Sequence, residues 1–247
     1  QIESPGGYLL DSEQLADRIS QLEGKKHRTV AYIPEYAYSG AAIISMGCDE
    51  IYMHPDAKIG DAAPIEVRPG EQFERAPEKV LSPLRETLKV LGERKGRPPA
   101  LLEAMADKDL RVYEVTHSQT GRKSYASEAN IEASGGEWIK GPLVAESRED
   151  NLLTVTGRRA HELKLANDPV HDMGELKQRL GIPATAVVPV SEQTWVDTMI
   201  TILKSPGVTF LLFMVGLICI YLEVYTVSGL FGIGGALCFA IFFWSRF

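Results

Sequence analysis

The pattern of apolar and polar positions divides the chain into a long mixed region and an apolar tail. Residues 1–205 alternate short apolar runs with charged segments, whereas residues 206–244 contain a single charged side chain, Glu223. A change of composition on this scale predicts a boundary between a soluble domain and a membrane region. We therefore expect three parts: a soluble domain over residues 1–190, a linker over residues 191–205 and a membrane region over residues 206–247.

Strand and helix patterns alternate in the first half of the soluble part. Short apolar runs at 28–33 and 50–53 predict strands, and leucines 81, 84, 88 and 91 form one stripe of a helix that ends near Lys95. Further helices are expected at 8–23, 41–46, 100–107, 160–165 and 173–180, and loops at 54–64 and 64–77. Strands that alternate with helices predict βαβ units and an α/β fold. From Arg111 the period changes to two, which predicts a β-meander inserted over about 111–150.

The apolar tail is long enough for two membrane passes. Its 39 residues, at about 1.5 Å each, exceed a hydrocarbon thickness of roughly 30 Å nearly twofold. We expect helices near 208–222 and 227–244 with a turn at 226–229. The first is short for a full crossing, so a re-entrant hairpin is an alternative. Glycines 229, 232, 234 and 235 would let the two helices approach closely.

Composition excludes several classes of function. The net charge is −7, and no cluster of lysines and arginines is interleaved with aromatic residues, so we expect no nucleic-acid partner. Three cysteines, of which only Cys48 lies outside the tail, provide no disulfide framework. The five histidines lack ligand spacing, and the tail segment Gly232–Gly235 lacks the context of a phosphate loop. We expect neither a metal nor a cofactor.

The candidate chemistry is hydrolysis by a serine and a lysine. A lysine that burial keeps neutral can accept the proton of a serine hydroxyl, and glycine amides can stabilise the oxyanion. The sequence contains a Ser4-Pro5-Gly6-Gly7 turn and, about thirty residues later, a strand-turn-helix pattern at Ser39-Gly40. Three lysines, Lys79, Lys89 and Lys95, lie on or near the leucine-striped helix. Helical periodicity does not choose among them.

These motifs resemble the ClpP/crotonase superfamily, and more narrowly the NfeD family of membrane-bound serine proteases, which is related to signal peptide peptidase A. The resemblance rests on Ser4-Pro5-Gly6-Gly7, on Ser39-Gly40-Ala41-Ala42 and on Ile59-Gly60-Asp61-Ala62-Ala63-Pro64-Ile65. It implies that Ser39 is the nucleophile and that Gly40 forms the oxyanion hole with Gly6 or Gly7. It also implies a repeated ββα fold for the soluble domain. Two departures from the family pattern are the order Gly40-Ala41 and the bulky residues Tyr36 and Tyr38.

The same resemblance selects Lys89 as the general base. In NfeD proteases a lysine precedes a Gly-Arg pair and a later Lys-Asp-Leu, which correspond here to Gly96-Arg97 and Lys108-Asp109-Leu110. An export signal and a first strand are expected before Gln1, because a strand normally leads into such a glycine turn.

The resemblance implies a multi-pass membrane endopeptidase that cleaves apolar peptide segments, with stomatin-like membrane proteins as substrates and homo-oligomers as the working form. Lys204 and Arg246 flank the tail and favour a cytoplasmic soluble domain, whereas the family places it on the extracytoplasmic side, which we expect here. Two alternatives remain: a catalytically inactive crotonase-fold scaffold that binds a membrane partner, and an acyl-CoA enzyme of the same fold. The last is disfavoured because no acid–base pair of carboxylates is identifiable.

Overall fold

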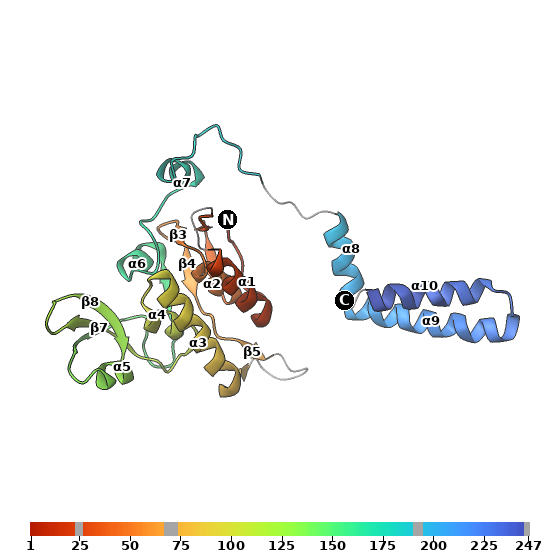
Figure 1. Ribbon diagram of the computed structural model, residues 1–247, viewed down its shortest axis with the longest axis horizontal. Helices are drawn as coiled ribbons and strands as arrows, with labels where there is room; N and C mark the ends of the chain where they lie inside the picture. The colour runs from red at the N-terminus through yellow and green to blue at the C-terminus, as the bar shows by residue number, and fades with distance from the viewer. Residues whose placement is uncertain (23–26, 67–73, 190–194, 245–247) are drawn as a thin grey trace. The chain divides into compact units, whose positions relative to one another are not determined.

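The chain forms two compact units, Gln1–Thr185 and Ala186–Phe247. The computed structural model describes residues 1–22, 27–66, 74–189 and 195–244. Every described strand belongs to the first unit, and the second consists of helices (Figure 1). The segment expected as a linker over 191–205 contains a helix, α8 (Trp195–Lys204). Glu23 and Arg246 lie outside the described residues.

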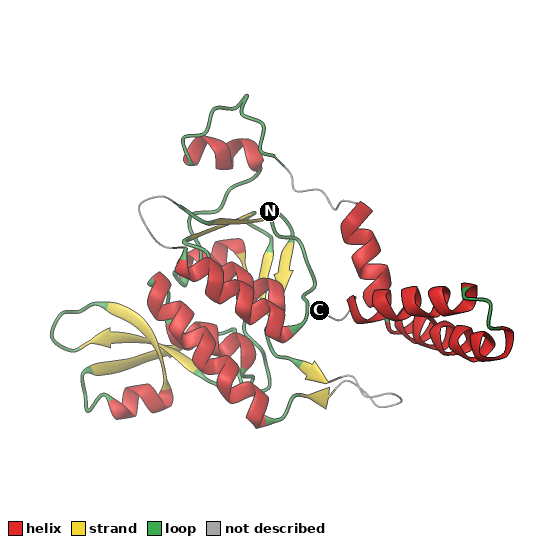
Figure 2. Ribbon diagram, turned by 45° about the vertical axis from the view of Figure 1, so that its right-hand side comes forward, coloured by secondary structure: helices red, strands yellow, loops and turns green. Residues whose placement is uncertain are grey.

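The first unit is a mixed α/β domain (Figure 2). Its helices are α1 (Leu9–Gln21), α2 (Gly40–Met46), α3 (Glu78–Lys95), α4 (Pro99–Ala106), α5 (Glu128–Ala133), α6 (Gly157–Glu162) and α7 (Met173–Arg179). Its strands are β1 (Val30–Ile33), β2 (Tyr36–Tyr38), β3 (Glu50–Met53), β4 (Lys58–Gly60), β5 (Ile65–Glu66), β6 (Glu74–Arg75), β7 (Val112–His117), β8 (Lys123–Ser127), β9 (Trp138–Leu143) and β10 (Thr154–Thr156).

Parallel pairing defines the centre of this unit. Strand β1 pairs with β3 in parallel, and β2 pairs in parallel with β4, whose other edge carries antiparallel β10. Ser4 forms a parallel bridge to Ala37 of β2, so the N-terminal segment extends the same sheet. Strands β2 and β4 lie where a turn and a loop were expected. Each has only three residues, too few to show a period of two.

Helix α2 forms part of the hydrophobic core. Six of its seven residues are buried, and small side chains allow its neighbours to approach closely. A Cβ on Gly47, the C-cap residue of α2, would lie 3.0 Å from Ala16 Cα of α1, so only glycine fits. The predicted leucine stripe of α3 is confirmed: Leu81, Leu84, Leu88 and Leu91 are all buried. The close contact of α1, α2 and α3 fixes the positions of both ends of α2.

The region from 111 to 150 is a small antiparallel sheet whose connectivity differs from the prediction. Strand β7 lies in the middle and pairs with both β8 and β9. The prediction of a meander, in which consecutive strands are neighbours, is therefore wrong for β9. Helix α5 between β8 and β9 returns the chain to the far side of β7. Local alternation predicts strands but not their order in a sheet.

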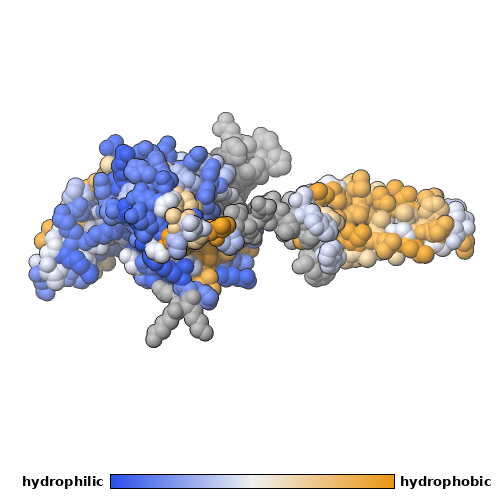
Figure 3. Space-filling model, turned by 90° about the horizontal axis from the view of Figure 1, so that it is seen from above, coloured by the Kyte–Doolittle hydropathy of each residue, from blue (hydrophilic) through white to orange (hydrophobic). Residues whose placement is uncertain are grey.

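The described residues of the second unit form three helices, of which α9 (Pro206–Thr226) is long and apolar enough to cross a membrane. Helix α10 (Leu230–Trp244) is also apolar but has 15 residues. These two helices confirm the expected pair, with a turn at 227–229. They pack closely, because a Cβ on Gly235 would lie 3.3 Å from the Gly216 carbonyl oxygen. On the face seen in Figure 3 the pair is mostly hydrophobic, with more polar residues at the end of the hairpin, whereas the first unit is mostly hydrophilic.

Candidate active site

Ser39 occupies the sharp turn between strand β2 and helix α2. It is the N-cap residue of α2, with φ 51° and ψ −126°. Its N–H donates to the carbonyl oxygens of Gly60 (3.2 Å) and Asp61 (2.9 Å), which hold the turn from the side of β4. A non-glycine residue at positive φ costs on the order of 1–3 kcal/mol, and such strain is typical of functional positions. The half-buried hydroxyl of Ser39 therefore stands in a backbone conformation that its surroundings enforce.

Gly6 packs directly against Ser39. Its φ is +131°, and a Cβ at this position would lie 2.6 Å from Ser39 Cβ and 3.1 Å from Ser39 Oγ. Hydrogen bonds between Ser4 and β2 bring the glycine turn to this place: Ser4 N–H donates to Tyr36 O, and Tyr38 N–H donates to Ser4 O. Gly6 N–H itself donates to Ser4 Oγ at 3.2 Å. In this conformation the Gly6 amide already has an acceptor.

Gly40 lies close to the Gly7 amide, and neither Gly7 N–H nor Gly40 N–H donates to a protein acceptor among the described residues. A Cβ on Gly40 would lie 3.2 Å from Gly7 N and would overlap Ser12 Oγ. A hollow of about 260 Å³ opens here, lined by Gln1, Ile2, Glu3, Ser4, Gly6, Gly7, Ser12, Gly40, Ala41 and Ile44. Two adjacent N–H groups that lack acceptors are what an oxyanion requires. The structure thus brings Gly6, Gly7, Ser39 and Gly40 together.

The structure does not bring Lys89 into contact with these residues. Its side chain is 43% exposed, and its Nζ lies 3.6 Å from the Glu86 carboxylate. Its charge also acts on Glu103 of α4: burial raises the pKa of that carboxyl, and Lys89 and Arg85 partly oppose the rise. No hydrogen bond joins Lys89 to Ser39 in the part of the chain that the structure describes. In this conformation Lys89 is solvated, whereas a lysine that acts as a base must lose its water.

The other two lysines of α3 lie at opposite ends of the helix. The Lys95 side chain is buried, and its Nζ lies 2.6 Å from Asp49 Oδ1. Burial raises the pKa of Asp49, but hydrogen bonds from Lys95 and Thr29 outweigh it and lower that pKa to about 2. Lys79 is exposed in the first turn of α3. Ala76 N–H, just before this turn, donates to Pro64 O at 3.2 Å, in the segment that follows Asp61.

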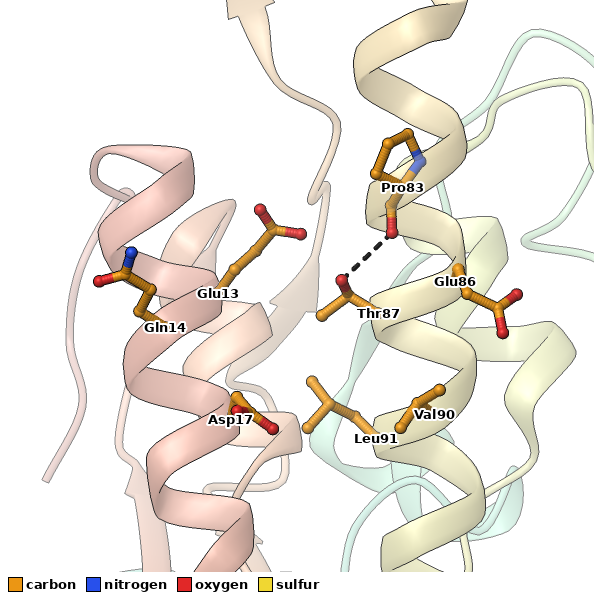
Figure 4. A pocket seen from close by; sticks show the side chains of 8 residues that line it. All are labelled: Glu13, Gln14, Asp17, Pro83, Glu86, Thr87, Val90 and Leu91. Carbon is orange, nitrogen blue, oxygen red and sulfur yellow. Dashed lines mark hydrogen bonds between the residues drawn. The ribbon is translucent and has the colours of Figure 1, made fainter.

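A larger hollow between α1 and α3, of about 570 Å³, is a different place (Figure 4). Its walls carry the carboxylates Glu13, Asp17 and Glu86, and Asp17 accepts a hydrogen bond from Arg94 at 3.0 Å. Its one hydroxyl group, on Thr87, donates to Pro83 O. None of the residues assigned here as nucleophile or oxyanion-hole donor is among the described residues that line it. Among the described residues no three side chains are grouped as metal ligands, so no residue set for a metal is assigned.

Sequence reasoning missed the supports of the site. Ser12 is buried and donates to Tyr8 O beneath Gly40. The rings of Tyr36 and Tyr38 stack 5.5 Å apart on the strand that leads to Ser39. The sequence carries one signal for the first of these, a serine at a core-facing position of the first helix. For the second it shows two tyrosines two residues apart, but their stacking was not predicted because β2 was not recognised as a strand.

The fold of the first unit identifies the class of protein before the family is considered. It is shared with the 1510-N membrane-bound stomatin-specific protease, in a serine-to-alanine variant with TM-score 0.51 and 19% identity, covering 74% of this chain and 71% of that one. A lysine-to-alanine variant of 1510-N in complex with a substrate peptide gives TM-score 0.53 and 17% identity, covering 81% and 80%. This is a protease-like α/β fold. The chain belongs to the NfeD1b family, whose N-terminal domain model matches residues 1–138.

Two curated proteins are similar to this chain. Membrane protein NfeD1b of Bacillus subtilis is 24% identical over 261 residues, which cover 95% of this chain and 56% of the relative. Uncharacterized protein MJ1495 of Methanocaldococcus jannaschii is 41% identical over 63 residues, or 26% of this chain and 20% of the relative. The chain thus spans about half of the first relative and a fifth of the second. It is a membrane protein with one clear apolar span and a shorter apolar helix.

Proposed function

We propose that the protein is a membrane-anchored serine endopeptidase of ClpP/crotonase type with Ser39 as its nucleophile. The observation that carries the proposal is the arrangement around this residue. Ser39 is held at positive φ against Gly6, and the Gly7 and Gly40 amides nearby lack acceptors among the described residues. A serine that only stabilised the turn would need no more than its backbone hydrogen bonds. Acyl transfer needs a nucleophile and hydrogen-bond donors for the oxyanion, and the nearby amides without acceptors can be those donors.

In the proposed reaction Ser39 Oγ attacks the carbonyl carbon of a peptide bond. The serine proton passes to the base, and the carbonyl oxygen becomes an oxyanion that accepts from Gly40 N–H and Gly7 N–H. The base then protonates the leaving amine as the C–N bond breaks, which leaves an acyl ester on Ser39. A water molecule, deprotonated by the same base, hydrolyses the ester and restores the hydroxyl. Gly6 N–H joins the oxyanion hole only if it leaves Ser4 Oγ.

The family resemblance assigns the base to Lys89, and we carry this assignment forward as part of the proposal. Lys89 can act only in a conformation where its amine leaves Glu86 and is desolvated, because desolvation is what disfavours the charged form of an amine. Lys79 is the alternative on the same helix: a backbone hydrogen bond joins Ala76, just before its turn, to Pro64, but its side chain is exposed and would also have to lose water. The two lysines are ten residues apart, or about 15 Å along a helix.

The proposed substrates are apolar segments of membrane proteins, with stomatin-like proteins as the first choice. The chain has the fold of a protease described as stomatin-specific and seen with a substrate peptide. An extended substrate would add as a strand beside the site. We also propose that the protein works as a homo-oligomer, that both apolar helices insert in the membrane, and that the first unit is on the extracytoplasmic side.

The proposal is tested with a fluorophosphonate probe on the full-length chain in detergent or lipid. We expect the wild type to be labelled and Ser39→Ala to lose labelling, while Ser118→Ala, which alters an exposed turn serine, serves as the matched control. Labelling at another serine, or none in any variant, would overturn the role of Ser39. In the latter case, retained binding of an apolar peptide would favour the scaffold alternative, for which the solvated Lys89 is the supporting observation.

A second series identifies the base. Lys89→Ala and Lys79→Ala are compared with Lys58→Ala, which removes an exposed lysine of β4. The variant that loses the base should retain folding but lose peptide cleavage by about 10²–10⁴-fold, the usual contribution of general base catalysis. Loss in Lys79→Ala alone would refute the assignment to Lys89. Equal activity in all three variants would exclude both lysines.

A further inference from the structure

Helix α8 carries an apolar stripe with little cover. Trp195, Met199 and Ile202 recur at spacings of four and three residues, which places them on one face of the helix. Their exposed fractions are 74%, 48% and 53%. Polar Asp197, Thr198 and Thr201 interrupt the apolar sequence, so α8 is amphipathic, unlike α9. Contiguous exposed apolar side chains on an amphipathic helix indicate a binding surface.

The corner between α8 and α9 is fixed by hydrogen bonds. Only Ser205 separates the two helices, and its Oγ caps α9 by accepting from Val208 N–H at 3.4 Å. Thr209 is buried, and its hydroxyl lies 2.9 Å from Ser205 O and 3.3 Å from Leu203 O. Both views show α8 turned away from the common axis of α9 and α10 (Figures 1 and 2). Thus α8 does not simply continue the apolar span.

The position of α9 determines what covers the stripe. Because α9 is the helix that can cross the bilayer, the membrane surface lies close to its first residue, Pro206. A ten-residue helix joined there by one residue stays within about 15 Å of that surface. The interfacial zone favours tryptophan and amphipathic helices, whose apolar side chains reach the acyl boundary. Continuity with the span therefore selects lipid, rather than a protein partner, as the occupant.

We propose that α8 lies in the interfacial layer of the bilayer, in the leaflet that α9 enters, with Trp195, Met199 and Ile202 at the acyl boundary. The partner is the lipid surface itself. The start of α9 is then held at a defined depth. Because α8 lies in the interface, α9 cannot move along the membrane normal without pulling α8 out of that layer. The contact is independent of catalysis, since none of its residues belongs to the candidate site.

The test measures the depth of Trp195 in phosphatidylcholine vesicles. The chain has three tryptophans, so Trp138→Phe and Trp244→Phe leave Trp195 as the single fluorophore. We expect stronger quenching by lipids brominated near the headgroup than by lipids brominated near the chain end, and weak quenching by aqueous acrylamide. Strong acrylamide quenching without lipid quenching would overturn the proposal. So would maximal quenching by the deep bromines, because α8 would then belong to the span.

A second arm asks whether the stripe holds the helix in the interface. In the same single-tryptophan background, Met199→Asp with Ile202→Asp should abolish quenching by the shallow brominated lipid and shift the emission to the red. The matched control Val187→Asp with Val188→Asp places the same two charges at apolar positions of the same unit outside α8, 88% and 49% exposed, and should change neither. Unchanged quenching in the double variant would show that the stripe does not bind lipid.

Discussion

At the scale of single residues, the substitution Gly6→Ala adds one methyl group beside Ser39 and so tests the candidate site. A Cβ there would lie 2.6 Å from Ser39 Cβ, and its φ of +131° suits only glycine. We expect Gly6→Ala to displace Ser39. The rate of fluorophosphonate labelling should fall, and the free energy of unfolding should fall as well. Labelling rate and thermal unfolding of the same preparation provide the two measurements.

Gly121→Ala is the control for backbone strain alone, because Gly121 also has positive φ but its Cβ would meet nothing within 4 Å. It should lose about 1 kcal/mol of stability and keep full labelling. If Gly6→Ala were labelled as fast as the wild type, the contact between Gly6 and Ser39 would have no part in the reactivity.

The sequence motifs predicted residues that the structure brings together around Ser39, whereas the predicted base lies apart from them. The motifs Ser4-Pro5-Gly6-Gly7 and Ser39-Gly40 could be recognised because each is a short continuous stretch of sequence. The structure brings the two stretches together. Whether a lysine can act as a base depends instead on the solvent exposure of its amine and on the charged groups around it. Lys89 lies beside Glu86 and is 43% exposed, which helical periodicity cannot reveal. Its role remains a prediction.

The ion pair of Asp49 and Lys95 predicts how stability changes in acid. Hydrogen bonds from Lys95 and Thr29 outweigh burial and lower the Asp49 pKa from 3.8 to about 2. Between pH about 4 and about 2 the unfolded chain therefore binds more protons at Asp49 than the folded chain does. The stabilisation is present above this window and is lost as the pH falls through it.

We expect Asp49→Asn to lower stability at neutral pH and to flatten the dependence of the unfolding midpoint on pH within that window. Chemical unfolding followed by circular dichroism at several pH values measures both effects. Asp56→Asn is the matched control, because Asp56 pairs with Arg158 at 3.3 Å where both side chains are about two-thirds exposed, and such pairs contribute little. A parallel pH dependence in wild type and Asp49→Asn would contradict the assignment.

At the scale of elements, the sequence predicted elements with a long periodic pattern. It missed very short strands and the pairing of strands that are far apart in the sequence. The α3 stripe extends over three turns, so its period is visible, and β3 has the predicted bounds Glu50–Met53. Strands β2 and β4 have three residues each and were missed. The return of β9 to β7 was missed because strand order depends on contacts between residues more than twenty positions apart.

The turn between α9 and α10 is held by one carboxylate, and this gives a prediction for the hairpin. Glu223 of α9 accepts hydrogen bonds from Gly229 N–H at 2.6 Å and Gly232 N–H at 2.9 Å, so it caps the start of α10. Capping side chains contribute about 1 kcal/mol. We therefore expect Glu223→Ala to speed hydrogen exchange of the Gly229 and Gly232 amides about five-fold in lipid.

The graded variant Glu223→Gln separates the cap from charge. Its amide oxygen can still accept one hydrogen bond, so its exchange rates should fall between those of wild type and Glu223→Ala. Amides near the middle of α9, such as that of Leu217, should not change in either variant. Equal protection of Gly229 in wild type and Glu223→Ala would mean that the turn is held by helix packing alone.

At the scale of the whole molecule, one chain carries both the candidate site and the apolar helices. Residues Gln1–Thr185 hold Ser39, and residues Ala186–Phe247 hold the apolar span. Tethering a site to the bilayer raises the effective concentration of substrates in the same membrane, to the millimolar range for short flexible linkers. For a site of modest intrinsic affinity, this proximity would determine which substrates are cleaved.

The full-length chain should therefore cleave an apolar peptide segment faster when both are in the same vesicles than when they are in separate ones. A soluble peptide with the same scissile sequence is the control, since its cleavage should not depend on where the membrane substrate is placed, and Ser39→Ala gives the background rate. Cleavage requires proximity only if the first unit meets substrate at the bilayer. Equal rates in shared and separate vesicles would imply that substrates reach Ser39 from solution, so the membrane helices would set the location of the protein without selecting what it cleaves.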